Sequence, residues 1–121
     1  MMKKVILNIL ILILLNKSQI LHANDNISFV EGIADLPIFE DMKNNKESLV
    51  IFDTNEGRFV NTEIFGKAEL DEAQKFYNRI LPNLGWKEEE LNYFKREKET
   101  LIINYKENRD VLYIFFKILP N

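Results

Sequence analysis

Cysteine is missing from the 121-residue sequence, and the one histidine, His22, lies close to the N-terminus. Without cysteine the chain has no disulfide, no thiolate zinc site, no thiol nucleophile and no cysteine for lipid attachment. Without histidine beyond residue 22 it also lacks the commonest general base of enzymes. Four glycines are too few for a glycine-rich phosphate loop, and there is no serine-centred elbow. These shortages favour a protein that is not an enzyme and holds no cofactor.

The first 23 residues have the layout of a secretory signal peptide. Residues 1–4 form a short basic start, residues 5–15 are apolar except for Asn8, and the segment ends on Leu21-His22-Ala23. Cleavage after Ala23 is predicted, and with it a periplasmic or secreted location. The apolar run has 11 residues, whereas a helix needs about 20 to span a bilayer. An uncleaved segment that anchors the chain is the alternative, and it is the only membrane attachment that we expect.

The chain that remains after cleavage is acidic. Removing residues 1–23 takes three lysines and no acid from a chain of formal charge −3, which leaves −6. A net-acidic domain without a basic run is a poor candidate for binding nucleic acid or anionic lipid through charge. We therefore expect the partner to be an envelope protein or another envelope component, and not nucleic acid.

Residues 24–47 are expected to form an N-terminal arm in front of an α+β domain at residues 48–121. The arm carries scattered apolar residues with no clear period, and Leu36-Pro37 favours an extended backbone. It is interpreted as a segment that packs across the sheet. A lid over a groove is the alternative.

A β-hairpin is predicted at the start of the domain. Residues 48–53 are a nearly continuous apolar run, residues 53–57 (DTNEG) form a turn cluster, and residues 58–65 alternate apolar and polar side chains. Asp53 can bond the backbone that follows it, and Gly57 supplies the positive φ that this kind of hairpin needs.

An amphipathic helix is predicted over residues 69–81. Its apolar side chains recur at helical spacing and form one stripe, made up of Ala73, Phe76, Tyr77, Ile80, Leu81 and Leu84. Asp71 and Gln74 favour a capping box at its start. Pro82 lacks the N–H of a continuing helix and Gly85 suits a left-handed exit, so the helix is expected to end there.

Three further strands are expected at residues 93–97, 100–106 and 111–118. The predicted fold class is therefore α+β: a single antiparallel sheet of about five strands (ββαβββ), with one helix packed on one face and an N-terminal arm.

Strands 48–53 and 111–118 are apolar on both faces, so they are placed side by side at the centre of the sheet. The short, charged strand 93–97 is placed at an edge. The face opposite the helix then needs a cover for its apolar side chains, and the arm is the nearest segment. Those side chains are Val50, Phe52, Tyr113 and Phe115, or their alternates.

Candidate binding residues lie at two places. Asp53, Glu56 and Arg58 come together at the hairpin turn, where a carboxylate pair could do acid–base work, although a solvated turn with an ion pair is favoured. Trp86 and Tyr93 could form an aromatic binding surface, or instead close the end of the core with the indole N–H near solvent.

No metal site is predicted. The turn at residues 53–57 has its glycine at the wrong position for a calcium loop, and Ile64 stands where the bidentate glutamate should be. Residues 88–90 are three consecutive glutamates, interpreted as a solvated connection.

Four motifs carry a resemblance to a known family. They are Asp35-Leu36-Pro37, the FD-x-x-EGR turn at residues 52–58, the FY-x(3)-LP-x-LGW helix exit at residues 76–86, and Phe94-Lys95-Arg96-Glu97. Through these motifs the chain resembles a family of small secreted or periplasmic alphaproteobacterial proteins of unknown function. The resemblance extends from about residue 34 to the end of the chain. It departs at Glu40-Asp41, where relatives often have a Pro-Gly turn. The resemblance implies an exported envelope protein, and it supplies no catalytic residues.

Together these features favour a non-catalytic periplasmic module that binds a protein or envelope component, through the sheet face or edge that the helix leaves free. A carrier of a small apolar ligand held between sheet and arm is the first alternative, and it requires an apolar cavity of about 300 Å³ or more. A carboxylate-dependent hydrolase, working through Asp53, Glu56 or residues 88–90, is the second.

Overall fold

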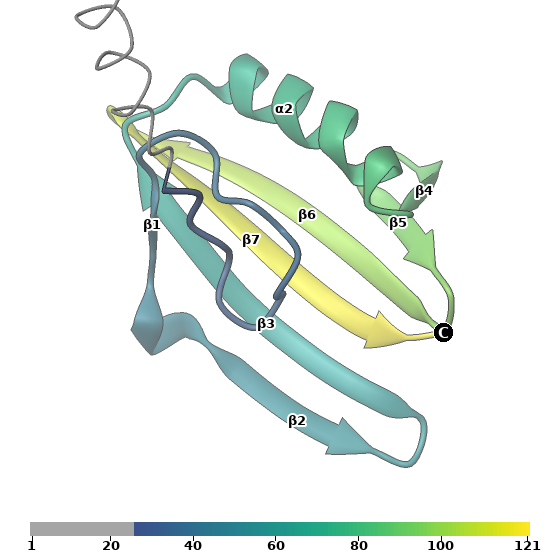
Figure 1. Cartoon of the computed structure of the whole chain (residues 1–121). Coiled ribbons are helices and arrows are strands. Elements are labelled where there is room, and N and C mark those ends of the chain that lie inside the picture. Colours follow the sequence, from purple (N-terminus) through teal and green to yellow (C-terminus); the bar gives the residue numbers. More distant parts are fainter. Residues whose placement is uncertain (1–25) are drawn as a thin grey trace, which may run out of the picture.

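The computed structural model describes residues 26–121, so the predicted signal peptide and its cleavage site lie outside the described residues. This part of the chain forms one antiparallel sheet of seven strands and one α-helix (Figure 1). The predicted α+β class and the single antiparallel sheet are confirmed, but the sheet has seven strands rather than five. Within residues 26–121, no helix is long and apolar enough to cross a bilayer.

The strands are β1 (Lys43–Asn44), β2 (Val50–Thr54), β3 (Gly57–Gly66), β4 (Lys87–Glu90), β5 (Tyr93–Arg96), β6 (Glu99–Asn108) and β7 (Val111–Pro120). They follow one another across the sheet as β1-β3-β7-β6-β5-β4, and β2 also pairs with β3. β1 and β2 lie end to end along one edge of β3, separated by the short 3-10 helix η2 (Lys46–Ser48). The two strands that the sequence did not predict are the short β1 and β4.

Of the two strands expected at the centre of the sheet, the first lies at its edge. Residues 48–53 were placed beside the last strand, but they form β2, which pairs with β3 alone among the described strands. Val50, Ile51 and Phe52 are each about half exposed. β3 takes the place beside β7, because its ten residues are long enough to pair with β7 on one side and with β1 and β2 on the other. The predicted edge strand is likewise second from the edge, since β4 pairs with β5.

Helix α2 (Leu70–Asn83) lies on one face of the sheet and uses the predicted apolar stripe. Ala73, Tyr77 and Leu81 are completely buried, and burying one large apolar side chain stabilises a fold by roughly 1.5–3 kcal/mol. The predicted capping box does not form, because the N-cap residue is Glu69 and makes no side-chain cap hydrogen bond. The helix also continues through Pro82, which lies in its last turn.

The helix ends in a Schellman motif built from the predicted exit residues. The Gly85 N–H donates to the Pro82 carbonyl at 3.1 Å, and the Trp86 N–H donates to the Leu81 carbonyl at 3.0 Å. Gly85 has a φ of +88°, a left-handed conformation that glycine adopts without strain. The motif turns Trp86 into the core, where it is 1% exposed.

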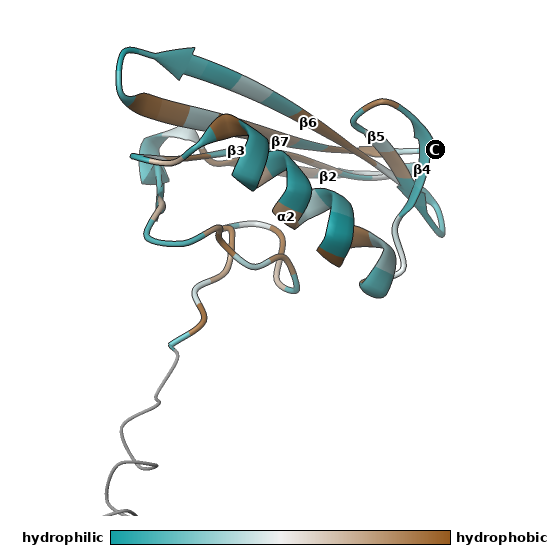
Figure 2. Ribbon diagram, turned by 90° about the horizontal axis from the view of Figure 1, so that it is seen from above, coloured by the Kyte–Doolittle hydropathy of each residue, from teal (hydrophilic) through white to brown (hydrophobic). Residues whose placement is uncertain are grey.

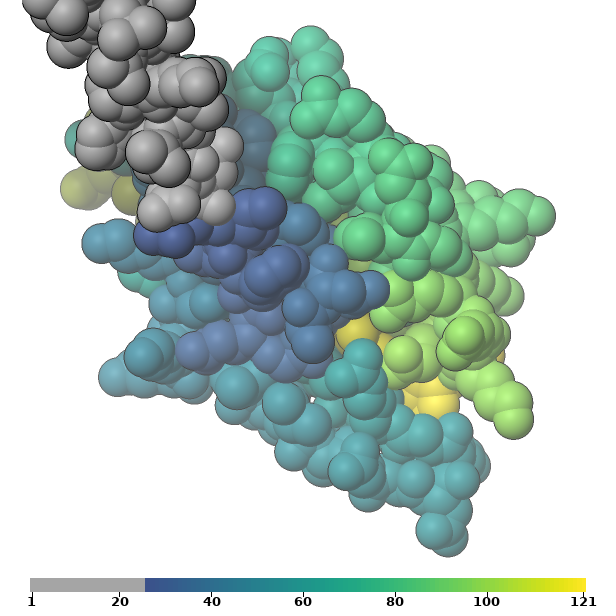
Figure 3. All heavy atoms as spheres, viewed as in Figure 1, coloured from purple at the N-terminus to yellow at the C-terminus, as the bar shows by residue number. Residues whose placement is uncertain are grey.

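The arm lies on the same face of the sheet as the helix, as Figure 2 shows, and beside it, as Figure 3 shows. Its apolar residues share one core with the helix and the inner side of the strands; they are Val30, Ile33, Leu36, Ile38, Phe39 and Met42. Tyr77 joins arm to helix, because its hydroxyl donates to the Pro37 carbonyl at 3.0 Å and accepts from the Phe39 N–H at 3.2 Å.

The prediction that the arm covers the face opposite the helix is therefore wrong. A helix is about 10 Å wide, whereas neighbouring strands lie about 4.8 Å apart, so one helix covers only two or three strands. The rest of the inner face, over β3 and β7, needs a second cover. The apolar residues of the arm provide it.

Candidate functional site

The three residues predicted at the hairpin turn separate in the structure. Asp53 and Glu56 are exposed, and the turn is held by Thr54, whose hydroxyl donates to the Gly57 carbonyl at 2.9 Å and accepts from the Glu56 N–H at 3.2 Å. Arg58 does not pair with either acid. Its Nε lies 2.8 Å from the carboxylate of Glu99 on β6 and its Nη1 donates to the Gly32 carbonyl at 3.2 Å, so it ties the arm to the far end of the sheet.

Trp86 and Tyr93 lie on opposite faces of the sheet. Trp86 is buried, and the Arg96 guanidinium lies over its ring at 4.2 Å. Arg96 in turn bonds the carboxylate of Asp35 at 2.5 Å and the carbonyl of Leu84 at 3.0 Å, which joins arm, helix exit and β5. The indole Nε1 is buried and has no hydrogen-bond partner among the described residues. Trp86 is therefore a core residue, whereas Tyr93 is 43% exposed.

The acidic residues of the hydrolase alternative do not gather. Asp53 and Glu56 lie at the β2–β3 turn, whereas residues 88–90 belong to β4, at the opposite edge of the sheet. Across residues 26–121, no group of three or more His, Cys, Asp or Glu side chains is placed to hold a metal ion.

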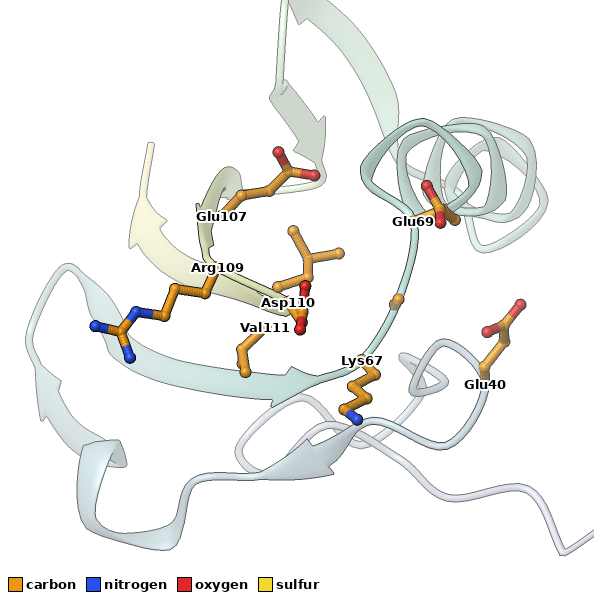
Figure 4. A pocket seen from close by; sticks show the side chains of 9 residues that line it. Glu40, Lys67, Glu69, Glu107, Arg109, Asp110 and Val111 are labelled. Carbon is orange, nitrogen blue, oxygen red and sulfur yellow. The ribbon is translucent and has the colours of Figure 1, made fainter.

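A polar hollow of about 500 Å³ lies at the end of the sheet where α2 begins (Figure 4). Its side chains come from the arm, from the connection between β3 and α2, and from the β6–β7 turn; they are Glu40, Lys67, Ala68, Glu69, Glu107, Arg109, Asp110, Val111 and Leu112. The basic and acidic groups are mixed, and the hollow is open to solvent. It contains no histidine, cysteine or serine to act as a nucleophile or base.

The opposite side of the sheet has no cover within residues 26–121 (Figure 2). Along β3, β6 and β7 every second side chain is buried beneath the helix and arm, so the alternate ones point the other way. We call this second set the uncovered sheet face. On the three ten-residue strands β3, β6 and β7 its members include Phe59, Asn61, Glu63, Phe65, Ile102, Asn104, Lys106, Tyr113, Phe115 and Lys117.

Aromatic side chains recur across the uncovered sheet face. Phe52, Tyr93, Phe65 and Phe115 are 50%, 43%, 36% and 37% exposed. Phe52 stacks on Phe59 with ring centroids 4.8 Å apart and planes 11° apart, and Phe65 stacks on Tyr113 at 6.4 Å and 24°. Large exposed apolar patches on folded proteins commonly mark interaction sites.

The centre of this face has an open hollow of about 420 Å³ beside Phe115. Glu63 and Asn104 lie directly opposite Phe115 on the two neighbouring strands, and Asn61 lies opposite Lys117. An aromatic ring is thus surrounded by two amides, one cation and one carboxylate. This arrangement can hold a single side chain of a partner and satisfy its polar atoms.

Of the predicted binding residues, Tyr93 alone belongs to this face. In the sequence, Phe52, Tyr113 and Phe115 were named only as apolar positions that need a cover. Their signal was that residues 111–118 are apolar on both faces, but this does not show which side of the sheet the arm occupies. Comparison with family models, curated proteins and solved structures finds no match for this chain.

Proposed function

We propose that this chain is an exported, non-catalytic binding module that docks an envelope protein or another envelope component on its uncovered sheet face. The observation that supports it is the set of exposed aromatic residues on that face, while the other face is filled by helix and arm. In an isolated chain these rings meet water, and burying them against a partner contributes about 25 cal/mol per Å² of apolar surface.

The carrier alternative has less support. Where the arm meets the sheet, Val30, Ile33 and Leu36 are at most 1% exposed, as are Val60 and Ile64 beneath them. The two hollows described above lie elsewhere. A ligand between arm and sheet would have to displace this packed core.

We also propose that the chain belongs to the exported family that its motifs resemble. Gly85 and Trp86 of the helix exit form the Schellman motif, and Arg58 of the FD-x-x-EGR turn ties the arm to β6. These motifs serve the fold, which agrees with a family that shares an architecture without a shared catalytic site. Cell fractionation that finds the chain shortened at Ala23 in the periplasm or medium would support export.

The docking proposal is tested by affinity purification from envelope extract. The full-length coding sequence, with a C-terminal tag, is expressed as the natural chain, as Phe65→Ser/Phe115→Ser and as Leu91→Ser. Leu91 is the control because it is 77% exposed but lies in the β4–β5 turn, at the other edge of the sheet from β3 and β7, which carry Phe65 and Phe115.

A specific partner should be retained by the natural chain and by Leu91→Ser, and lost from Phe65→Ser/Phe115→Ser. The purified partner should then bind the natural chain at least tenfold more tightly than the face variant. Equal retention by all three chains contradicts the proposal. Recovery of lipid in place of protein, unchanged by the face substitutions, favours the carrier.

A further inference from the structure

Charge is divided unequally between the two sides of this protein. Without the residues before position 26 (Lys3, Lys4, Lys17 and Asp25), the 16 basic and 19 acidic residues of the chain become 13 and 18. The uncovered sheet face reverses this balance. It has five lysines and two glutamates, namely Lys43, Lys87, Lys95, Lys106, Lys117, Glu63 and Glu90.

The strand register places these lysines on the same side as the aromatic rings. Lys106 lies opposite Tyr113, Lys43 lies opposite Phe65, and Lys95 follows Tyr93 by two residues on β5. All five lysines are exposed, whereas Glu63 is half-buried and lies 3.5 Å from the side-chain amide of Asn45. Cations therefore lie among apolar rings on a face that is positive overall, in a domain that is negative.

We propose that the occupant of the uncovered sheet face is an acidic polypeptide surface that also carries apolar or aromatic side chains. This inference rests on the proposed function and gives the chemistry of its partner. Opposite charge steers such a partner to this face, and like charge repels it from the acidic remainder of the domain. A second copy of this chain does not fit face to face, because two positive faces would oppose each other.

The geometry of the rings favours a polypeptide over a nucleic acid or a glycan. Phe52 and Phe59 are nearly parallel at the spacing of adjacent strands, so the rings stand up from the sheet and present their edges. Phe65 and Tyr113 form a second stacked pair, which is wider, with centroids 6.4 Å apart and planes 24° apart. Bases and sugars stack on free ring faces, whereas side chains of a protein can pack between upright rings and against their edges.

The hollow beside Phe115 supplies an anchor point. Its volume of about 420 Å³ accommodates one large side chain, and Lys117 lies on its rim. A partner aromatic residue next to a carboxylate would fill the hollow and pair with Lys117. Interfaces commonly derive most of their binding energy from a few such anchors.

The test uses defined polymers as probes. Binding of the purified full-length chain to a glutamate–tyrosine copolymer is measured by fluorescence anisotropy, alongside polyglutamate, a lysine–tyrosine copolymer, single-stranded DNA and anionic phospholipid vesicles. Lys106→Glu/Lys117→Glu reverses two charges on the face. Lys75→Glu/Arg79→Glu reverses two exposed charges on the helix and is the matched control.

The natural chain should bind the glutamate–tyrosine copolymer best, and its affinity should fall as salt rises. Lys106→Glu/Lys117→Glu should weaken that binding at least tenfold, and Lys75→Glu/Arg79→Glu by less than twofold. Lys95→Glu/Lys106→Glu, which leaves β7 unchanged, should reproduce the loss if the first variant fails to fold.

Equal weakening by the helix variant would overturn the inference, because net charge alone would then explain the binding. Preference for DNA or vesicles over the copolymer would also overturn it. If no anionic probe binds while a purified partner still requires Phe65 and Phe115, the partner is not acidic and the proposed function stands. If that partner also binds without Phe65 and Phe115, both the inference and the proposed function fail.

Discussion

At the scale of single residues, Tyr77 connects the three parts that form the core. Its ring packs against Phe116 of β7 with centroids 5.4 Å apart, and its hydroxyl bonds the backbone of Pro37 and Phe39 in the arm. Burial raises the pKa of this hydroxyl, although its hydrogen bond with Phe39 opposes the shift. Tyr105, also partly buried, has a raised pKa because of burial and because of the nearby charge of Glu88.

Tyr77→Phe should lower the free energy of unfolding at pH 8 by roughly 1–3 kcal/mol, since two backbone groups lose their partner. A raised pKa means that the folded chain holds the proton more tightly than the unfolded one. The stabilisation is therefore complete below about pH 10, the usual tyrosine value, and falls above it by up to about 1.4 kcal/mol per pH unit for each group.

Urea unfolding at pH 8, 10 and 11 measures both effects. The natural chain should lose stability between pH 10 and 11, and Tyr77→Phe should lose less over the same interval. Tyr77→Phe/Tyr105→Phe should lose least. An equally steep decline in all three chains would show that these two hydroxyls do not set the alkaline limit.

At the scale of elements, the helix exit depends on the backbone of Gly85. A β-carbon there would lie 3.4 Å from Arg96 Cδ, an ordinary contact, so space does not exclude a side chain. The φ of +88° does exclude an unstrained one. Gly85→Ala should therefore destabilise the protein by about 1–2 kcal/mol. Gly85→Asn should cost less, because asparagine tolerates this conformation. Equal losses in urea unfolding would mean that the left-handed turn is not the cause.

Among the described residues the edge strand β2 pairs on one side only, with β3, so its other side presents unpaired backbone groups, and it carries three half-exposed apolar side chains. Such an edge favours self-association, and a lysine on it opposes this. Ile51→Lys should slow the growth of light scattering in a concentrated solution at 37 °C several-fold. Ile27→Lys removes a more exposed apolar residue of the arm, which lies outside the seven strands, and should have little effect. If both substitutions slow the growth equally, apolar exposure in general, and not the edge, is responsible.

The sequence was sufficient for those elements whose signals are local. The stripe from Ala73 to Leu81 and the turn at Gly85 depend on spacing and backbone conformation within a few residues. Strand order was not predictable in this way, because a short apolar run such as Val50–Phe52 is compatible with a strand at the edge of a sheet or at its centre. The side of the sheet that the arm occupies depends on how much of the inner sheet face α2 leaves uncovered. No local sequence pattern indicates this. Apart from Tyr93, the residues of the candidate site were missed for the same reason, since Phe115 and Lys117 become a surface only when the arm is on the other face.

At the scale of the whole molecule, the two faces of the sheet have different roles. Helix and arm fill one face and supply the stability, through residues such as Tyr77, Trp86 and Phe116. The other face holds exposed rings and lysines that the fold does not need. Substitutions on the two faces should therefore have different effects. Core substitutions should lower stability, and face substitutions should lower binding at nearly unchanged stability.

Site-specific photo-crosslinking tests that division most directly. The crosslinking amino acid benzoylphenylalanine replaces Phe115 on the uncovered sheet face in one chain and Asn78 on the exposed side of α2 in another. Each chain is irradiated in the cells that produce it, and the covalent products are separated by size. We expect a discrete adduct with one partner at position 115 and none at position 78. An adduct at position 78 alone, or equal adducts at both positions, would contradict this expectation.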